Sequence, residues 1–103
     1  MIDKVKIGGI VYDVVLEETL GDSGYAGQLR VHRSQIAINA QIQAQFAQVT
    51  LWHEIIHGIL ANAGVGIADH NEELIEKIAY GVLQVLVDNP ALTDGTLEKE
   101  GDS

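Results

Sequence analysis

The chain has 103 residues, of which 47% are apolar, so it has the length of a single domain and enough apolar side chains for a packed core. Its 15 acidic residues against 6 Lys and Arg give a formal net charge of −9, which disfavours nucleic acid as a partner because phosphate backbones are negatively charged. Cysteine is absent, which excludes disulfides and thiolate metal ligands, and no apolar run is long enough for a signal peptide or a membrane span, so we expect a cytoplasmic protein without membrane contacts.

The first forty residues carry the alternation of apolar and polar side chains that is typical of strands in a half-buried sheet. Two such stretches lie on either side of Gly8 and Gly9, a pair suited to a tight turn between strands. A third strand is expected at Tyr25–Val31 and a fourth at Gln35–Asn39. These stretches predict a small antiparallel sheet of three or four strands.

From about Gln41 the apolar residues recur every three or four positions, which predicts a helix that ends at Gly64. Asn71 is suited to cap the N-terminus of a second helix, and Pro90, the only proline, is suited to end it. Both helices carry an apolar face, so we expect them to pack together.

The predicted elements combine into one α+β domain at residues 1–93, a small sheet followed by two packed helices. Residues 94–103 hold four acidic side chains and one lysine, which predicts an acidic, flexible tail. No linker between domains is expected.

The first predicted helix contains the segment His53-Glu54-Ile55-Ile56-His57, an H-E-x-x-H sequence. Two histidines four residues apart lie about 40° apart around a helix and one turn apart along it, so both imidazoles can bind one metal ion. Neutral imidazole is a good zinc ligand. Glu54 is predicted to be the catalytic base that deprotonates a water, while Zn²⁺ would lower the pKa of that water and polarise a substrate carbonyl.

A helical wheel places the two histidines at the edge of the apolar face and Glu54 further toward solvent. That apolar face consists of Val49, Trp52, Ile56, Ile59, Leu60 and Ala63. The histidines are therefore expected on a rim between core and solvent, where a metal would stay reachable. The alternative reading is a pair of surface histidines beside a solvated glutamate.

A catalytic zinc site needs a third protein ligand and leaves one position open. The downstream candidates are His70, Glu72, Glu73 and Glu76. Glu72 and Glu76 flank the apolar face of the second helix, one turn apart, so either could face the first helix. Glu73 is expected to face away, and a histidine in a polar loop such as His70 is more often solvated.

The two histidines, followed after eighteen residues by Glu76, resemble the H-E-x-x-H-x(18)-E signature of the gluzincin metallopeptidases. The E-x-x-A sequence that begins at Glu76 is similar to the one that carries the third ligand in ImmA/IrrE-like metallopeptidases of phages and mobile elements. The resemblance covers about residues 35–88. It implies a minimal zincin-like fold with Zn²⁺ bound by His53, His57 and Glu76. It also implies that Gln35–Asn39 is an edge strand that pairs with an extended substrate.

The predicted function is a zinc-dependent metallopeptidase that hydrolyses peptide bonds, with a regulatory protein as one candidate substrate. The acidic composition favours a basic peptide. Tyr25 and Tyr80 are candidate donors to the oxyanion of the reaction, with ordinary packing as the alternative role of each. The competing hypotheses are a non-enzymatic acidic interaction module and a zinc-bound domain that has lost catalysis.

Overall fold

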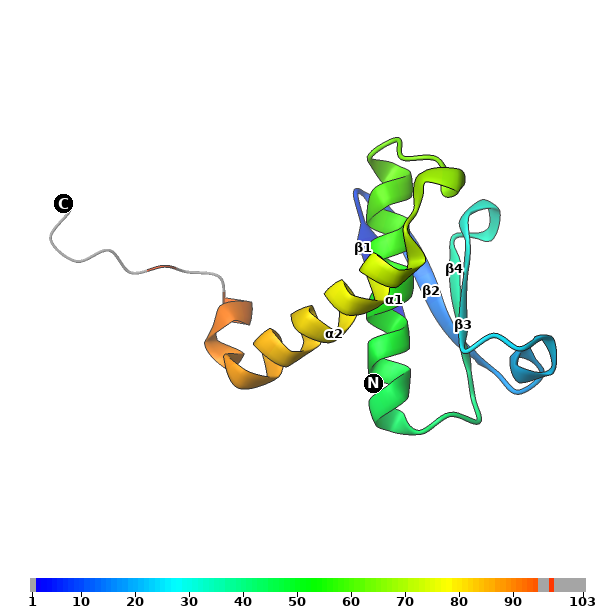
Figure 1. The fold of residues 1–103 in the computed structure, drawn as a ribbon, viewed down its shortest axis with the longest axis horizontal. Helices are drawn as coiled ribbons and strands as arrows, with labels where there is room; N and C mark the ends of the chain where they lie inside the picture. The colour runs from blue at the N-terminus through cyan, green and yellow to red at the C-terminus, as the bar shows by residue number, and fades with distance from the viewer. Residues whose placement is uncertain (1, 95–96, 98–103) are drawn as a thin grey trace, which may run out of the picture.

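Four strands form one mixed sheet in the computed structural model, which describes residues 2–94 and Leu97 (Figure 1). The strands lie in the order β1-β2-β4-β3. Their bounds are β1 (Lys4–Ile7), β2 (Ile10–Glu17), β3 (Gly27–Arg30) and β4 (Gln35–Asn39). The prediction of an α+β fold is confirmed. The sheet is mixed rather than antiparallel, because β2 and β4 run parallel while the other two pairs are antiparallel.

The parallel pair arises because the chain does not return directly beside β2. After β2 it passes through the 3-10 turn η1 (Leu20–Ser23), forms β3, and turns back at η2 (Val31–Arg33) before β4 enters the sheet. β4 lies between β2 and β3 in the sheet. It runs antiparallel to β3 and therefore parallel to β2. The interposed strand supplies the crossover that every parallel pair needs.

The expectation that Gln35–Asn39 forms an edge strand is wrong, because β4 has a neighbour on each side. Its central residues Ile36, Ala37 and Ile38 are almost fully buried, at 0%, 0% and 3% exposure. A run of consecutive apolar residues is typical of a strand covered on both faces. The edge beside β4 is formed by β3 instead.

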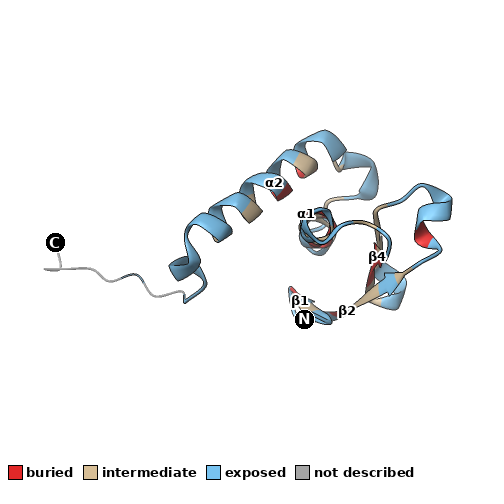
Figure 2. Cartoon of the chain, turned by 90° about the horizontal axis from the view of Figure 1, so that it is seen from below, coloured by how far each residue is buried: buried red, intermediate tan, exposed pale blue. Residues whose placement is uncertain are grey.

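Two helices follow the sheet, α1 (Ala44–Asn62) and α2 (Glu72–Asp88), joined through the 3-10 turn η3 (Ile67–Asp69). The predicted cap of the second helix is confirmed, because the side-chain oxygen of Asn71 accepts a hydrogen bond from the backbone N–H of Leu74 at 3.0 Å. Viewed end-on, α1 lies between the sheet and α2 (Figure 2). The central helix is therefore covered from two sides.

The core lies between the sheet and α1, and the partly buried side chain of Trp52 packs against it. It is built on the buried residues Ile7, Tyr12, Ile36, Ile38 and Ile55. The sheet covers the side of α1 that carries Glu54, which is only 8% exposed. The expectation that Glu54 lies toward solvent is therefore wrong. The predicted apolar face is buried only in part, because Val49 on it is 5% exposed and Ile59 is 49% exposed.

Beyond α2, Pro90–Asp94 forms a further 3-10 turn, η4. Asp94, the first residue of the predicted acidic tail, therefore belongs to this turn. The rest of that prediction, residues 95–103, lies outside the described residues except for Leu97. Among the helices of the described part of the chain, none is long and apolar enough to cross a membrane.

Candidate metal centre

The two helices bring three potential metal ligands together where the N-terminus of α2 crosses α1. His53 and His57 come from successive turns of α1, and Glu72 is the first residue of α2. The Oε1 atom of Glu72 lies 3.0 Å from Nε2 of His53 and 2.7 Å from Nε2 of His57. The three ligand atoms all lie within 4.8 Å of one another. One ion could contact all three.

In their neutral form, the imidazoles carry fewer protons than the acceptors that face them need. A carboxylate only accepts hydrogen bonds, and a neutral imidazole has a single N–H. His53 faces a carboxylate at both ring nitrogens, Glu76 at 3.3 Å from Nδ1 and Glu72 at 3.0 Å from Nε2. A neutral ring cannot donate to both carboxylates, so in that form one of the two contacts has no proton. The group formed by His53, His57 and Glu72 could therefore bind a metal ion, which would satisfy the facing lone pairs.

The remaining ligand candidates take different positions. Glu76 lies one turn beyond Glu72, on the Nδ1 side of His53 rather than beside the two Nε2 atoms. Its role as third ligand stays a prediction, and Glu72 is the carboxylate that lies between the two histidines here. The carboxylate of Glu73 pairs with Lys77 at 3.1 Å, with a side chain 81% exposed. His70 contacts His57 through its Nδ1 atom at 2.7 Å.

Glu54 lies on the same helix but on the side that faces β3. Burial raises the pKa of its carboxyl group to about 7. The neighbouring imidazole of His53 favours the charged form, whereas the carboxylates of Glu72 and Glu76 oppose it. A carboxyl group with a pKa near neutrality can both accept and release a proton under ordinary conditions.

A glycine on the edge strand makes room for Glu54. A Cβ atom on Gly27 of β3 would lie 2.5 Å from Cγ2 of Thr50 and 3.2 Å from Cγ of Glu54. Both distances are shorter than ordinary contacts, so only glycine lets β3 lie this close to α1. The role of Gly27 was not predicted from the sequence. Its signal was a glycine within a predicted strand, which often marks a close approach of the backbone.

The potential ligands and Glu54 line one cleft of about 340 Å³ between α1, the start of α2 and β3. The strand contributes Gly27, Gln28 and Leu29 to its wall. Its rim carries four exposed apolar side chains, those of Tyr25, Val31, Phe46 and Ile67. The cleft thus combines charged groups in its wall with an apolar rim.

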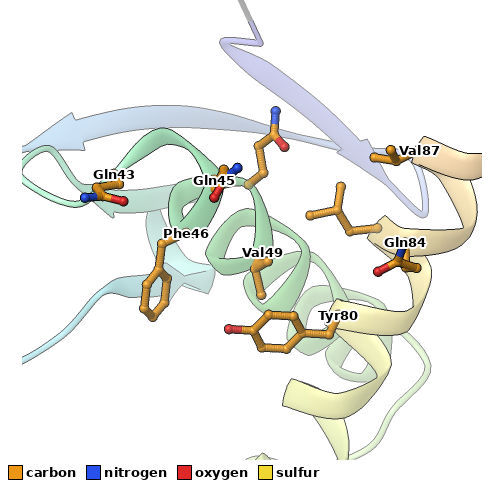
Figure 3. A pocket seen from close by; sticks show the side chains of 9 residues that line it. Gln43, Gln45, Phe46, Val49, Tyr80, Gln84 and Val87 are labelled. Carbon is orange, nitrogen blue, oxygen red and sulfur yellow. The ribbon is translucent and has the colours of Figure 1, made fainter.

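A second groove, of about 500 Å³, lies between the start of α1 and the second half of α2 (Figure 3). Tyr80 lines this groove with Phe46 and Val49, and no histidine or carboxylate belongs to its lining. Of the two candidate oxyanion donors, Tyr25 lines the cleft with the potential metal ligands and Tyr80 does not.

Comparisons of the chain with known protein families, with curated proteins and with solved structures find no match. The resemblance to zincin metallopeptidases therefore rests on the H-E-x-x-H sequence and the glutamates of α2 alone.

Proposed function

We propose that the protein is a zinc-dependent metallopeptidase. The observation that carries the proposal is the convergence of His53, His57 and Glu72 in one cleft that also contains the buried carboxyl group of Glu54. Two imidazoles and one carboxylate form a ligand set that suits zinc and leaves a coordination position open. The resemblance of the motif to gluzincin metallopeptidases supports the same assignment.

Glu54 is the catalytic base in this proposal. Zinc, when bound, supplies a lowered pKa for water and polarisation of the substrate carbonyl. The carboxylate of Glu54 takes the proton from the attacking water and delivers it to the amine that leaves. The packing of β3 against α1 holds the carboxyl group at the wall of the cleft and limits its contact with bulk water.

The edge strand β3 is the surface on which we place the peptide. It pairs with β4 on one side, and its residues Gly27, Gln28 and Leu29 line the cleft. An extended peptide that adds to a strand edge is held by main-chain hydrogen bonds, with specificity supplied by side-chain pockets. The exposed apolar rim favours apolar substrate side chains, and the acidic groups of the cleft favour a basic residue nearby.

Metal content and hydrolysis test the proposal in sequence. The purified protein should contain about one zinc per chain by elemental analysis, and His53→Ala should lose it. His32→Ala is the matched control, because His32 is exposed in η2 and does not line the cleft. Wild-type protein without zinc, or equal retention of zinc by His53→Ala, would contradict the metal site.

Glu54→Gln separates an enzyme from a metal-binding domain without catalysis. This variant should retain zinc and lose the cleavage that wild-type protein catalyses on a mixed peptide library, read by mass spectrometry. If cleavage persists in Glu54→Gln, the proposed base is wrong. If wild-type protein binds zinc and cleaves no peptide, the non-catalytic alternative stands.

A further inference from the structure

His70 lies beside the proposed metal site, and both of its ring nitrogens have partners. Nε2 lies 3.0 Å from the backbone oxygen of Val65, and Nδ1 lies 2.7 Å from Nδ1 of His57. A backbone carbonyl only accepts hydrogen bonds, so Nε2 of His70 must carry a proton. In the neutral ring, Nδ1 of His70 is then left as a hydrogen-bond acceptor.

The contact between the two histidines is an in-plane hydrogen bond rather than aromatic stacking. Stacked rings keep their atoms about 3.5 Å apart, whereas the two Nδ1 atoms are 2.7 Å apart. The ring centroids are 5.0 Å apart and the planes differ by 14°. For two imidazoles whose Nδ1 atoms are 2.7 Å apart, a centroid distance of 5.0 Å is close to the largest possible, and it is reached only when the rings point at one another edge to edge. The small angle between the planes makes the two rings nearly coplanar. A hydrogen bond in this geometry needs one proton between the two Nδ1 atoms.

We infer that His70 is a positioning residue that keeps the proton of His57 on Nδ1 and so leaves Nε2 free to bind a cation. His57 donates from Nδ1 to His70, and His70 donates from Nε2 to Val65. The role of Nε2 in binding a cation rests on the proposed function, whereas the contacts of His70 with His57 and Val65 do not depend on it.

A count of protons shows what this direction implies for the contact with Glu72. His57, His70 and their neighbours make three contacts, to Glu72, to one another and to Val65. Two neutral rings supply only two protons. If His57 gives its proton to the contact with His70, as we infer, none is left for the contact between its Nε2 atom and Glu72. That is the contact where a cation would take the place of the missing proton.

The arrangement also separates His70 from the ligand role considered from the sequence. Its Nδ1 atom points at Nδ1 of His57, and its Nε2 atom points at Val65, so neither nitrogen faces the position between His57 and Glu72. A hydrogen-bond partner on the far nitrogen of a metal-binding histidine commonly fixes its tautomer. Neutral histidines in general use this device to present a defined nitrogen.

The first test reads the tautomer directly in metal-free protein. At about pH 8.5, well above the ordinary pKa of imidazole, ¹⁵N chemical shifts of the ring distinguish a proton on Nδ1 from one on Nε2. His57 should carry its proton on Nδ1 in wild-type protein and shift toward Nε2 in His70→Leu. His70→Asn keeps an acceptor near the position of Nδ1 and should restore the wild-type signal. A wild-type His57 with its proton on Nε2 would overturn the inference without any variant having to fold.

The second test measures affinity for Zn²⁺ by competition with a chelating dye. His70→Leu should weaken zinc binding about 10- to 100-fold, as expected when a metal-binding histidine loses the hydrogen-bond partner of its other ring nitrogen. His70→Asn should recover most of the affinity. Equal affinity of His70→Leu and wild-type protein would overturn the inference. A loss in His70→Asn as large as in His53→Ala would make His70 a ligand and would also overturn it. If wild-type protein binds no zinc, the proposed function fails, while the tautomer experiment still decides the inference.

Discussion

Gly27 on the edge strand and Glu54 on the central helix lie so close together that a single added carbon atom on Gly27 would come within 3.2 Å of Cγ of Glu54. The close approach positions the proposed base and the proposed peptide-binding strand relative to one another. It also makes the glycine a sensitive point, because any side chain there must push β3 away from α1.

We therefore expect Gly27→Ala to destabilise the protein by about 1–3 kcal/mol, the usual cost of overpacking, and to lower peptide cleavage more than zinc affinity. Urea unfolding, zinc competition and the cleavage assay measure the three quantities. Gly66→Ala is the control, since a Cβ atom at Gly66 meets nothing within 4 Å. Equal behaviour of the two variants would remove the argument for close packing at Gly27.

The order of the glutamates in zinc binding is a second prediction. Glu72→Gln should weaken zinc affinity by more than about 100-fold, because it removes a metal ligand rather than a group that only hydrogen-bonds to a ligand. Glu76→Gln should have a smaller effect, since Glu76 contacts only the Nδ1 atom of His53. Glu73→Gln is the matched control, with its exposed side chain paired to Lys77. The reverse order for Glu72 and Glu76 would support the ligand assignment made from the family signature.

The cap of α2 links helix stability to the same site. Asn71→Ala removes the hydrogen bond to the backbone N–H of Leu74 and should cost about 1 kcal/mol in unfolding free energy. Because Glu72 is the next residue, zinc affinity should fall as well. Asn89→Ala, which removes a hydrogen bond at the opposite end of α2, serves as control and should leave zinc affinity unchanged. A loss of stability without any loss of affinity would separate the cap from the site.

A partly buried ion pair outside the cleft, between Arg30 and Glu17, gives a prediction for acid stability. Arg30 binds both carboxylate oxygens of Glu17, at 2.5 and 2.7 Å. Hydrogen bonding to Arg30 lowers the pKa of Glu17 below its ordinary value. The pair therefore stabilises the fold above the ordinary glutamate pKa of about 4.3, and that contribution is lost as pH falls through the lower folded value.

Glu17→Gln should lower the unfolding temperature at neutral pH and make its decline below about pH 5 less steep than in wild-type protein. Thermal unfolding followed by circular dichroism over a pH series measures both effects. Asp13→Asn is the comparison variant, because the Lys4–Asp13 pair is exposed and exposed pairs contribute little. Parallel pH profiles for Glu17→Gln and wild-type protein would rule out the linkage.

Much of the fold follows from local patterns. The two helices, the cap at Asn71 and the turn at Gly8 and Gly9 were predictable because each depends on neighbouring residues. Strand order was not, because alternation of side chains describes each strand but not its partner. The apolar run Ile36-Ala37-Ile38 is typical of a central strand, and these residues are buried. The edge position predicted for this strand came from the family resemblance instead.

The site was predictable only in part, for related reasons. The motif placed His53 and His57 on one side of a helix, and that arrangement is present. The position of Glu54 was misjudged because α1 contacts the sheet on one side and α2 on another, so its apolar pattern does not identify one inner face. The choice between Glu72 and Glu76 depends on how α2 crosses α1, which residue spacing does not determine.

The placement of the potential ligands on two different helices has a mechanical consequence. α2 meets the rest of the fold through α1, and the sheet lies beyond α1 (Figure 2). An ion held by His53, His57 and Glu72 would act as a cross-link between the helices, close to the N-terminal end of α2. Removal of the ion by a chelator should then speed hydrogen exchange of the α2 amides, while the amides of β2 and β4 keep their protection. The ion would thus change the local stability of α2 and leave that of the sheet unchanged.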